Sequence, residues 1–334
     1  MKPPVWIAAL GATLLLGLAW TSGASLLDGL KAVYHRVLPL DLREALWQVR
    51  WHLGEVVWRE KTAYITPWSY AIVLVVFALE RVIPAKRQRV LSVGTAQDFL
   101  WFNADLAFKL VWLSAFLAVL KGVYDRHLGF LTIHAVEAWP AAARFMLSFL
   151  VFDFLNWLHH VIRHRVEILW YFHMIHHSQR QMNLFTDGRI HLMEHLVART
   201  LVFIPMYMFQ VGLPTVFWFA MFLDWYTRVY HANLRTHYGA FKYILVTPQS
   251  HRIHHSLDPR HVNKNFGLFL TVWDRLFGTL YAKYDEYPET GVDDKDFPFE
   301  HMVGGLSLFA SLWAQLVYPF RLVVRRLGAA AGWA

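Results

Sequence analysis

The sequence predicts an all-α, polytopic membrane protein, and three observations support this fold class. Hydrophobic residues make up 56% of the 334 residues and charged residues only 17%, whereas a soluble domain carries about a quarter charged residues. Apolar stretches close to the roughly 20 residues that cross a bilayer as a helix recur along the chain. Basic residues concentrate between these stretches. We expect about four transmembrane helices and a re-entrant helical hairpin, with a histidine-rich helical region on the cytoplasmic side.

Composition also excludes several kinds of site. The net charge of +8 does not indicate nucleic-acid binding. The basic residues lie mostly in loops between apolar segments, where the positive-inside rule and attraction to anionic headgroups explain them. Cysteine is absent, so the chain has no disulfide, thiolate ligand or thiol nucleophile. Any metal ion must therefore be held by histidine, carboxylate or water.

Residues 1–90 are assigned to an N-terminal membrane anchor and an amphipathic region. Residues 5–20 are apolar and follow Lys2. They fit either a cleaved signal peptide, with small residues for cleavage at 21–25, or a first transmembrane helix. The absence of cysteine argues against a secreted product and favours the anchor. The mixed charges between residue 26 and about residue 66 predict surface helices.

Three further apolar spans follow, at residues 67–84, 99–120 and 141–162. The second contains Asp105 and Lys109, which at i and i+4 can pair on one helix face. The link 121–140 carries only two Lys or Arg residues, whereas the stretches 81–97 and 163–199 are much richer in them. The positive-inside rule therefore predicts that these two stretches are cytoplasmic and that the link lies outside.

Residues 196–230 form a long apolar run that is interrupted at 212–214 by Gly-Leu-Pro. Basic residues flank both ends, so a helical hairpin that enters and returns on the same side fits best. The polar region 231–300 is then cytoplasmic, and residues 91–300 are expected to form the catalytic domain. The apolar stretch 303–320 precedes three arginines, which a crossing helix would place outside. We therefore assign residues 301–334 to an interfacial or re-entrant helix and a basic tail.

Histidines carry the strongest signal of a functional site. The chain has 19, and 14 of them lie between His159 and His261. Three clusters have the i, i+3 or i+4 spacing that projects side chains from one helix face. Imidazole is a neutral ligand for zinc, copper, iron and nickel. Eight such ligands are too many for one zinc, which takes four, and fit two metal ions with positions open for O2 and substrate. The three clusters are His160 and His164; His173, His176 and His177; and His251, His254 and His255.

This pattern resembles the fatty acid hydroxylase and sterol desaturase superfamily of membrane non-haem di-iron enzymes. The resemblance covers about residues 145–285 and extends beyond the histidines. Leu158 and Val161 depart from the residues that the family often has beside its first histidine. A register starting at His159 is therefore an alternative, although the lead-in at Asp153 favours His160. The matching elements are Asp153-Phe154, LWYFHMIHHS at 169–178, Asn183, Thr186, Arg189, His191, Glu194, His231-Ala232-Asn233, TPQSHRIHHS at 247–256, Asn265-Phe266-Gly267 and WDRLFGT at 273–279.

The resemblance implies two iron ions that use O2 and two electrons to hydroxylate or desaturate an unactivated C–H bond of a lipid. It implies that the eight clustered histidines are metal ligands, with His231 as a ninth. His191 is a further candidate ligand, or a group that supports one. His195, His237 and His261 are interpreted as ordinary polar residues. The candidates for orienting imidazole N–H groups, which could equally be helix-cap or ion-pair residues, are Asp153, Glu194, Asn233 and Asp274.

The electrons must come from another protein. The chain has no Rossmann glycine motif, flavin motif or fused haem domain. We therefore expect a separate ferredoxin or cytochrome b-type donor. A basic face could dock an acidic carrier, and a bacterial inner membrane suits the short loops. The arginines assigned to this face are Arg163, Arg165, Arg180 and Arg260.

Two other functional classes fit parts of the pattern. A membrane zinc hydrolase would use histidines and carboxylates, but it needs only three or four ligands and a general base. A metal transporter would place its ligands in a path through several spans, whereas most of these histidines lie in polar segments. The identity of the bound metal would distinguish a zinc hydrolase from a di-iron oxygenase. O2 consumption would distinguish both the hydrolase and the transporter from the oxygenase. An acyl chain, a sterol, a carotenoid and an amino-lipid headgroup remain equally compatible with the sequence.

Overall fold

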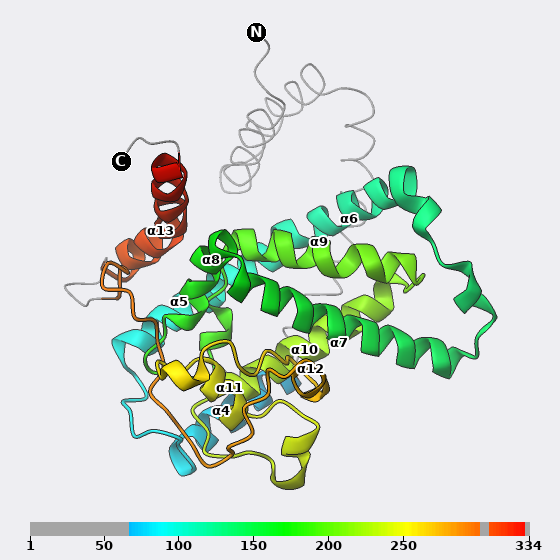
Figure 1. The fold of residues 1–334 in the computed structure, drawn as a ribbon. Coiled ribbons are helices and arrows are strands. Elements are labelled where there is room, and N and C mark those ends of the chain that lie inside the picture. The colour runs from blue at the N-terminus through cyan, green and yellow to red at the C-terminus, as the bar shows by residue number, and fades with distance from the viewer. Residues whose placement is uncertain (1–66, 301–306, 331–334) are drawn as a thin grey trace. The chain divides into compact units, whose positions relative to one another are not determined.

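The computed structural model describes residues 67–300 and 307–330 (Figure 1). The apolar segment expected at 5–20 and the amphipathic region that follows it lie outside the described residues. Within those ranges the chain is helical, as predicted, and its β structure is limited to isolated bridges. The α-helices are α4 (Pro67–Val82), α5 (Val93–Phe108), α6 (Ser114–Val123), α7 (Ala141–Arg165), α8 (Glu167–His177), α9 (Leu192–Met208), α10 (Leu213–His231), α11 (Pro248–His254), α12 (Val272–Leu276) and α13 (Ser307–Ala330).

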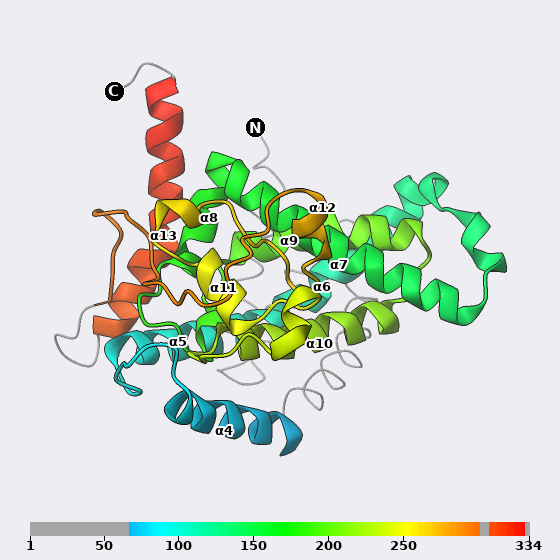
Figure 2. The same ribbon diagram turned by 60° about the horizontal axis from the view of Figure 1, so that its bottom comes forward.

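The largest hydrophobic core lies between α6, α7, α9 and α10, which run alongside one another (Figures 1 and 2). Phe152 of α7 packs there against α9, whose Val202 and Met206 are fully buried. Pro205 lies inside α9 without ending the helix. Burial of a large apolar side chain contributes roughly 1.5–3 kcal/mol, so this core holds the end of α7 that carries His160 and His164 in a fixed position.

The second predicted span differs from the expected continuous helix at 99–120. Ser92 caps the N-terminus of α5 by accepting a hydrogen bond from Thr95 N, so the helix begins at Val93. A π-helical turn, Lys109–Leu113, separates α5 from α6, and such turns often lie at functional sites. The predicted pair of Asp105 and Lys109 is confirmed, with a carboxylate oxygen 2.8 Å from Nζ.

The apolar run predicted at 196–230 divides into two helices, α9 and α10, and the break between them begins slightly earlier than the interruption at 212–214 indicated. The turn occupies residues 209–212, with Gln210 in the left-handed region at φ 55°. Pro214 lies in the first turn of α10, where its missing N–H costs no helical hydrogen bond.

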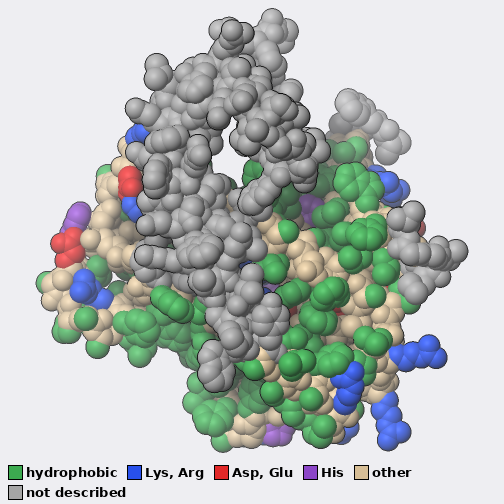
Figure 3. Space-filling model, turned by 180° about the vertical axis from the view of Figure 1, so that it is seen from behind, with side chains coloured by type: hydrophobic (Ala, Val, Ile, Leu, Met, Phe, Trp, Pro, Cys, Tyr) green, Lys and Arg blue, Asp and Glu red, His purple; other side chains and the backbone are tan. Residues whose placement is uncertain are grey.

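Two of the described helices are long and apolar enough to cross a membrane by length and composition, Ala141–Arg165 and Ser307–Ala329. The first agrees with the span predicted at 141–162. The second covers a segment that we interpreted as interfacial or re-entrant. Large apolar side chains are also exposed on α4, α10 and α13, among them Leu74, Trp218 and Trp313. Figure 3 shows broad areas of such side chains on one face, and these features indicate membrane association.

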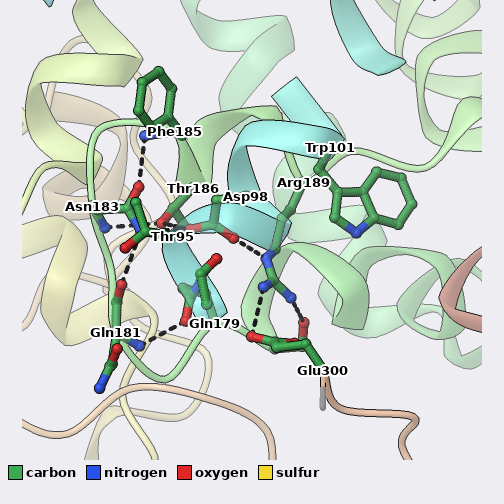
Figure 4. A network of polar contacts seen from close by, with 12 residues as sticks. Thr95, Asp98, Trp101, Gln179, Gln181, Asn183, Phe185, Thr186, Arg189 and Glu300 are labelled. Atoms are coloured by element: carbon green, nitrogen blue, oxygen red, sulfur yellow. Dashed lines mark hydrogen bonds and ion pairs between the residues drawn. The ribbon is translucent and has the colours of Figure 1, made fainter. Parts of the chain in front are cut away.

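A buried polar network joins α5 to the loop that follows α8 (Figure 4). Asp98 of α5 is completely buried and accepts hydrogen bonds from Asn183, Thr186 and Arg189. Arg189 also donates to Glu300 at 2.8 Å and to Ser178 Oγ at 3.0 Å. Because Ser178 directly follows His177, this network fixes the end of α8.

Candidate metal centre

Nine buried or half-buried histidines form two compact groups, each with its ligand nitrogens within 4.8 Å of one another. Only His164 is half-buried; the other eight are buried. The two groups are adjacent, because the rings of His177 and His255, one from each group, stack with their centroids 4.3 Å apart. The first histidine group is His160, His164, His173, His177 and His254, and the second histidine group is His176, His231, His251 and His255.

Helix geometry explains how the histidines divide between the groups. In each HxxHH block the first and last histidines are i and i+4 and point the same way. Thus His173 and His177 of α8 enter the first group, and His251 and His255 at α11 enter the second. The intervening histidine points around the helix into the other group. Each block therefore contributes to both groups, so neither group forms without α8 and α11 packed together.

The break between α7 and α8 brings the first group together. α7 ends at Arg165, Val166 is extended (φ −97°, ψ 111°), and α8 begins at Glu167. The chain thus turns between His164 and His173, whose rings lie 4.9 Å apart between centroids. In the second group, His231 is the last residue of α10. α11 is capped by Thr247, which accepts a hydrogen bond from Ser250 N.

The distances between ring nitrogens fit ligands that share an ion. Nitrogens about 2.1 Å from one ion lie roughly 3.0 Å apart at a right angle and roughly 3.4 Å apart at the tetrahedral angle. In the first group, His173 Nε2 lies 3.2 Å from Nε2 of both His160 and His177. In the second group, His231 Nε2 lies 2.8 Å from His251 Nε2 and 3.1 Å from His176 Nε2.

The outer nitrogens of four histidines have hydrogen-bond acceptors, which fixes their tautomer. His160, His231 and His254 donate from Nδ1 to the carbonyl oxygens of Phe266 (2.9 Å), Thr227 (2.7 Å) and Lys264 (2.9 Å). His173 Nδ1 donates to Glu194 Oε2 at 2.6 Å. In each ring Nε2 is then left as a lone-pair donor, and bound histidines generally require such partners. Nε2 of His254 has no hydrogen-bond partner in the described part of the chain.

Burial keeps the imidazoles in the form that binds metal. The pKa of His254 is lowered to about 4, and the pKa values of His176, His177 and His251 lie well below the usual value. Desolvation is the largest cause in each case, because it penalises the charged ring. These rings are therefore neutral at pH 7 and can donate a lone pair.

The four candidate orienting residues occupy different places. Glu194 bonds His173, as that interpretation requires, and also forms an ion pair with Arg163. Asp153 instead accepts from Trp273 Nε1 at 2.8 Å, and Asn233 bonds Lys86 and Arg252. Asp274 accepts from the backbone N–H groups of Phe266 (2.8 Å) and Gly267 (2.7 Å). Asp274 thereby holds the segment that contains Phe266, whose carbonyl oxygen accepts the hydrogen bond from His160.

The remaining histidines lie outside both groups. His191 caps α9, where its Nδ1 accepts from Met193 N at 3.0 Å. His159 is buried, and its Nε2 lies 3.2 Å from Asn156 Oδ1. His195 is buried against Asp105 at 2.5 Å.

The assignment of Arg163 to a docking surface is wrong. Its side chain is only 11% exposed and is paired with the buried carboxylate of Glu194. A desolvated carboxylate needs a nearby cation, so Arg163 belongs to the support of His173 rather than to the surface. Arg165 and Arg180 are exposed.

Replacing Glu194 with glutamine should weaken metal binding at the first group by about 10–100-fold, the usual effect of removing a ligand's hydrogen-bond partner. The amide keeps the size of the side chain but removes the charge that pairs with Arg163. Competition with a chelator would measure the change. The matched control is Glu289→Gln, since Glu289 is exposed and pairs with Lys86. Equal metal affinity in both variants would contradict the role assigned to Glu194.

Several contacts of this centre were missed by sequence reasoning. The carbonyl oxygens of Thr227, Lys264 and Phe266 carry no signal in a side-chain pattern, although Phe266 lies in the Asn-Phe-Gly element. Asp187, whose Oδ1 lies 3.5 Å from His231 Nδ1, falls between recognised motif positions. Its only signal was its place beside Thr186.

The chain resembles known proteins in the region that contains these histidines. A model of the fatty acid hydroxylase family matches residues 145–279, which include all nine histidines. No solved structure matches the chain.

Three curated relatives illustrate the likeness. Ornithine lipid hydroxylase OlsE of Rhizobium tropici is 31% identical over 145 residues, covering 43% of this chain and 44% of that protein. Alkylglycerol monooxygenase of Homo sapiens is 27% identical over 185 residues, covering 53% and 40%. Very-long-chain aldehyde decarbonylase GL1-1 of Oryza sativa subsp. japonica is 28% identical over 145 residues, covering 39% and 23%. The match thus spans less than half the length of each relative.

Proposed function

Residues 145–279 match the model of the fatty acid hydroxylase family, and from that premise we propose that this chain is an O2-dependent di-iron enzyme that hydroxylates or desaturates a lipid. The observation that carries the proposal is the pair of buried histidine groups. The relatives support it, since their names describe a lipid hydroxylase, a monooxygenase and an aldehyde decarbonylase.

The donor set favours iron over zinc. The first group offers five imidazoles and the second offers four, whereas a zinc site rarely takes more than four ligands. Iron accepts imidazole ligands in larger numbers and reacts with O2. When bound, the two irons would supply the binding and reduction of O2. His191, which caps α9, is not included among the ligands that we propose.

The reaction balances with one external reductant. In hydroxylation, O2, two electrons and two protons convert a C–H bond into C–OH, and the second oxygen atom leaves as water. In desaturation the same inputs remove two hydrogens from adjacent carbons, a C=C bond forms, and both oxygen atoms leave as water. The histidines hold the irons, their carbonyl and carboxylate partners keep Nε2 directed inward, and buried Phe266 and Tyr230 exclude water from the rings.

The membrane arrangement that we propose keeps about four spans, including α7, and a hairpin of α9 and α10 that returns on the same side. Exposed apolar side chains on α10 support a lipid-facing surface. The histidine groups then face the cytoplasm of a bacterial inner membrane.

The domain division that we propose is 1–90, 91–300 and 301–334. The second boundary follows Glu300, whose carboxylate accepts a hydrogen bond from Arg189 at 2.8 Å and another from Gln315 of α13 at 3.4 Å. The first falls between α4 and α5. Glu80 of α4 nevertheless accepts hydrogen bonds from Leu184 N and Asn233 N, so the N-terminal region contributes to the support of the catalytic domain.

A separate ferredoxin or cytochrome b-type protein is proposed to supply the electrons. Arg165 and Arg180 are exposed near the centre and are candidates for docking it. If they do so, reversing their charge should slow turnover with the carrier protein but leave turnover with a chemical reductant unchanged.

The test is O2 uptake by the detergent-purified chain after anaerobic reconstitution with ferrous iron, with a chemical reductant and a lipid extract. We expect lipid-dependent O2 uptake and, by mass spectrometry, lipids that have gained one oxygen atom or lost two hydrogens. Protein reconstituted with zinc is the control. Lipid hydrolysis by the zinc form, with no O2 uptake by the iron form, would favour a zinc hydrolase instead.

A further inference from the structure

A cavity of about 940 Å³ lies between α4, the start of α5 and the segment that follows α8. We call it the α4–α5 cavity. Pockets that hold small-molecule ligands usually have volumes of roughly 300–1,000 Å³, so this cavity is large enough for a ligand. None of the nine grouped histidines lines it. A molecule bound there therefore does not need to contact the metal centre, and the inference goes beyond the proposed oxidation.

Most of the wall of the α4–α5 cavity is apolar. Leu74 of α4 is 67% exposed, and Phe99 of α5 packs edge-on against Phe185 with the ring centroids 5.3 Å apart. Val75 and Val82 of α4 are exposed beside it, and exposed apolar surface of this kind indicates contact with lipid. An acyl chain forms no hydrogen bonds, so it can cover such a wall without leaving a polar group unpaired. The larger apolar side chains of the wall are Val73, Leu74, Phe77, Phe99, Phe185 and Phe299.

Two arginines, Arg89 and Arg180, add positive charge to the wall. Both side chains are exposed, and neither forms an ion pair or a hydrogen bond with the residues that the structure describes. The guanidinium of Arg180 lies 3.8 Å from the centre of the Phe299 ring, which holds it against the wall while its N–H groups remain available. Both cations can therefore bind an anion.

Negative charge in the wall is already paired. Glu300 is the only carboxylate among the lining residues, and it accepts hydrogen bonds from Arg189 at 2.8 Å and from Gln315 at 3.4 Å. The first turn of α5 also lines the cavity and contains no acidic residue, and the N-terminal end of a helix adds partial positive charge. An anion in the cavity thus meets two unpaired arginines and no unpaired carboxylate.

We propose that the α4–α5 cavity binds an anionic phospholipid of the membrane, with an acyl chain along the apolar wall and the phosphate beside Arg89 and Arg180. Guanidinium groups bind phosphate through paired, charge-assisted hydrogen bonds. A phospholipid combines the two chemistries that the wall presents. Free phosphate would leave the apolar wall in water, and an uncharged lipid would leave both arginines without a partner.

The bound lipid also supports the end of α8. Gln179 and Glu300 line the cavity and belong to the segments that the buried polar network brings together (Figure 4). Gln179 donates to the carbonyl oxygen of Gly94 at 3.2 Å and accepts from Gln181 N at 2.7 Å. Because Gln179 lies two residues after His177, a lipid packed against it stabilises the segment that directly follows the histidines of α8.

Lipid binding can be measured without turnover. The full iron-loaded chain in detergent micelles would be titrated anaerobically with phosphatidylglycerol, phosphatidylcholine and diacylglycerol that carry identical acyl chains. The shift of the thermal unfolding midpoint gives an apparent affinity for each lipid. We expect at least tenfold tighter binding of the anionic lipid than of the other two, and no shift with inorganic phosphate. Equal affinities for the three lipids, or an equal shift with phosphate alone, would overturn the proposal.

The variant Arg89→Gln with Arg180→Gln should lower the affinity for phosphatidylglycerol to that for phosphatidylcholine. Lysine at both positions should keep the preference, because the positive charges remain. The matched control is Arg126→Gln with Arg144→Gln, which removes the same charge from exposed positions outside the cavity. No electron carrier is present, so the docking role proposed for Arg180 does not enter. An unchanged preference in the first variant, or the same loss in the control, would contradict the assignment.

Cross-linking distinguishes this site from the metal centre. Phosphatidylglycerol with a photoactivatable diazirine on its acyl chain would be bound and irradiated, and the labelled peptides identified by mass spectrometry. We expect labelling of α4 and α5. Labelling confined to α7, α10 and α11 would overturn the proposal and leave the proposed oxidation standing. Labelling of α4 and α5 in a chain that forms no O2-dependent product would do the reverse.

Discussion

His176→Ala should lower the iron content from about two ions per chain to about one and reduce lipid oxidation by more than about 100-fold. Loss of a partner behind a ligand already costs 10–100-fold, and this substitution removes a ligand itself. Only three imidazoles, His231, His251 and His255, then remain in the second group. Elemental analysis of the detergent-purified variant beside the wild-type chain measures the metal content directly.

The control is His237→Ala, because His237 is half-buried and lies outside both groups. It should keep both irons. His164→Ala should lose iron from the first group, and circular dichroism would show whether each variant keeps its helices. Two irons and full activity in His176→Ala would contradict the assignment of the second group. One zinc and no iron in the wild-type chain, even after reconstitution with ferrous iron, would contradict the di-iron proposal as a whole.

Sequence spacing predicted eight of the nine grouped histidines, because i, i+3 and i+4 offsets follow from helix geometry alone. The spacing did not predict how these histidines divide between the two groups. The division depends on α8 packing against α11. His176 of α8 thereby joins His251 and His255, and His254 of α11 joins His173 and His177. His231 stands alone in the sequence, and only the resemblance to the family singled it out.

Residues that support ligands were harder to predict than the ligands. Backbone carbonyls such as that of Lys264 have no signature in a sequence, since any residue could supply them. Asp153 and Asp274 were recognised as motif residues, yet they hold Trp273 and the backbone at Phe266. Their carboxylates position the segment around the centre, a role that tertiary contacts alone define.

Helices were predicted better than their boundaries. The apolar pattern of 99–120 indicated one span, but Ser92 starts the helix earlier and the π-helical turn at Lys109 divides it. Hydropathy reports which segments avoid water, whereas caps and local hydrogen bonds decide where a helix begins and ends.

Asp98→Ala should destabilise the fold by about 3–5 kcal/mol, the usual cost of leaving one member of a buried ion pair alone. Asp98 and Arg189 are both completely buried, and Asp98 also accepts hydrogen bonds from Asn183 (2.7 Å) and Thr186 (2.8 Å). Removing the carboxylate leaves the Arg189 guanidinium with Glu300 as its only carboxylate partner among residues 67–300 and 307–330. Reversible unfolding in detergent micelles would measure the free energy.

Two further variants separate charge from packing. Asp98→Asn keeps the size of the side chain, so any loss that it shares with Asp98→Ala comes from the missing charge and the hydrogen bonds that the second oxygen accepts. The double variant Asp98→Leu with Arg189→Met should recover much of the loss, because both buried charges are removed together. Glu289→Ala, which breaks the exposed pair with Lys86, should cost far less. If Asp98→Ala cost no more than Glu289→Ala, the network could not be what holds Ser178, and with it the end of α8, against α5.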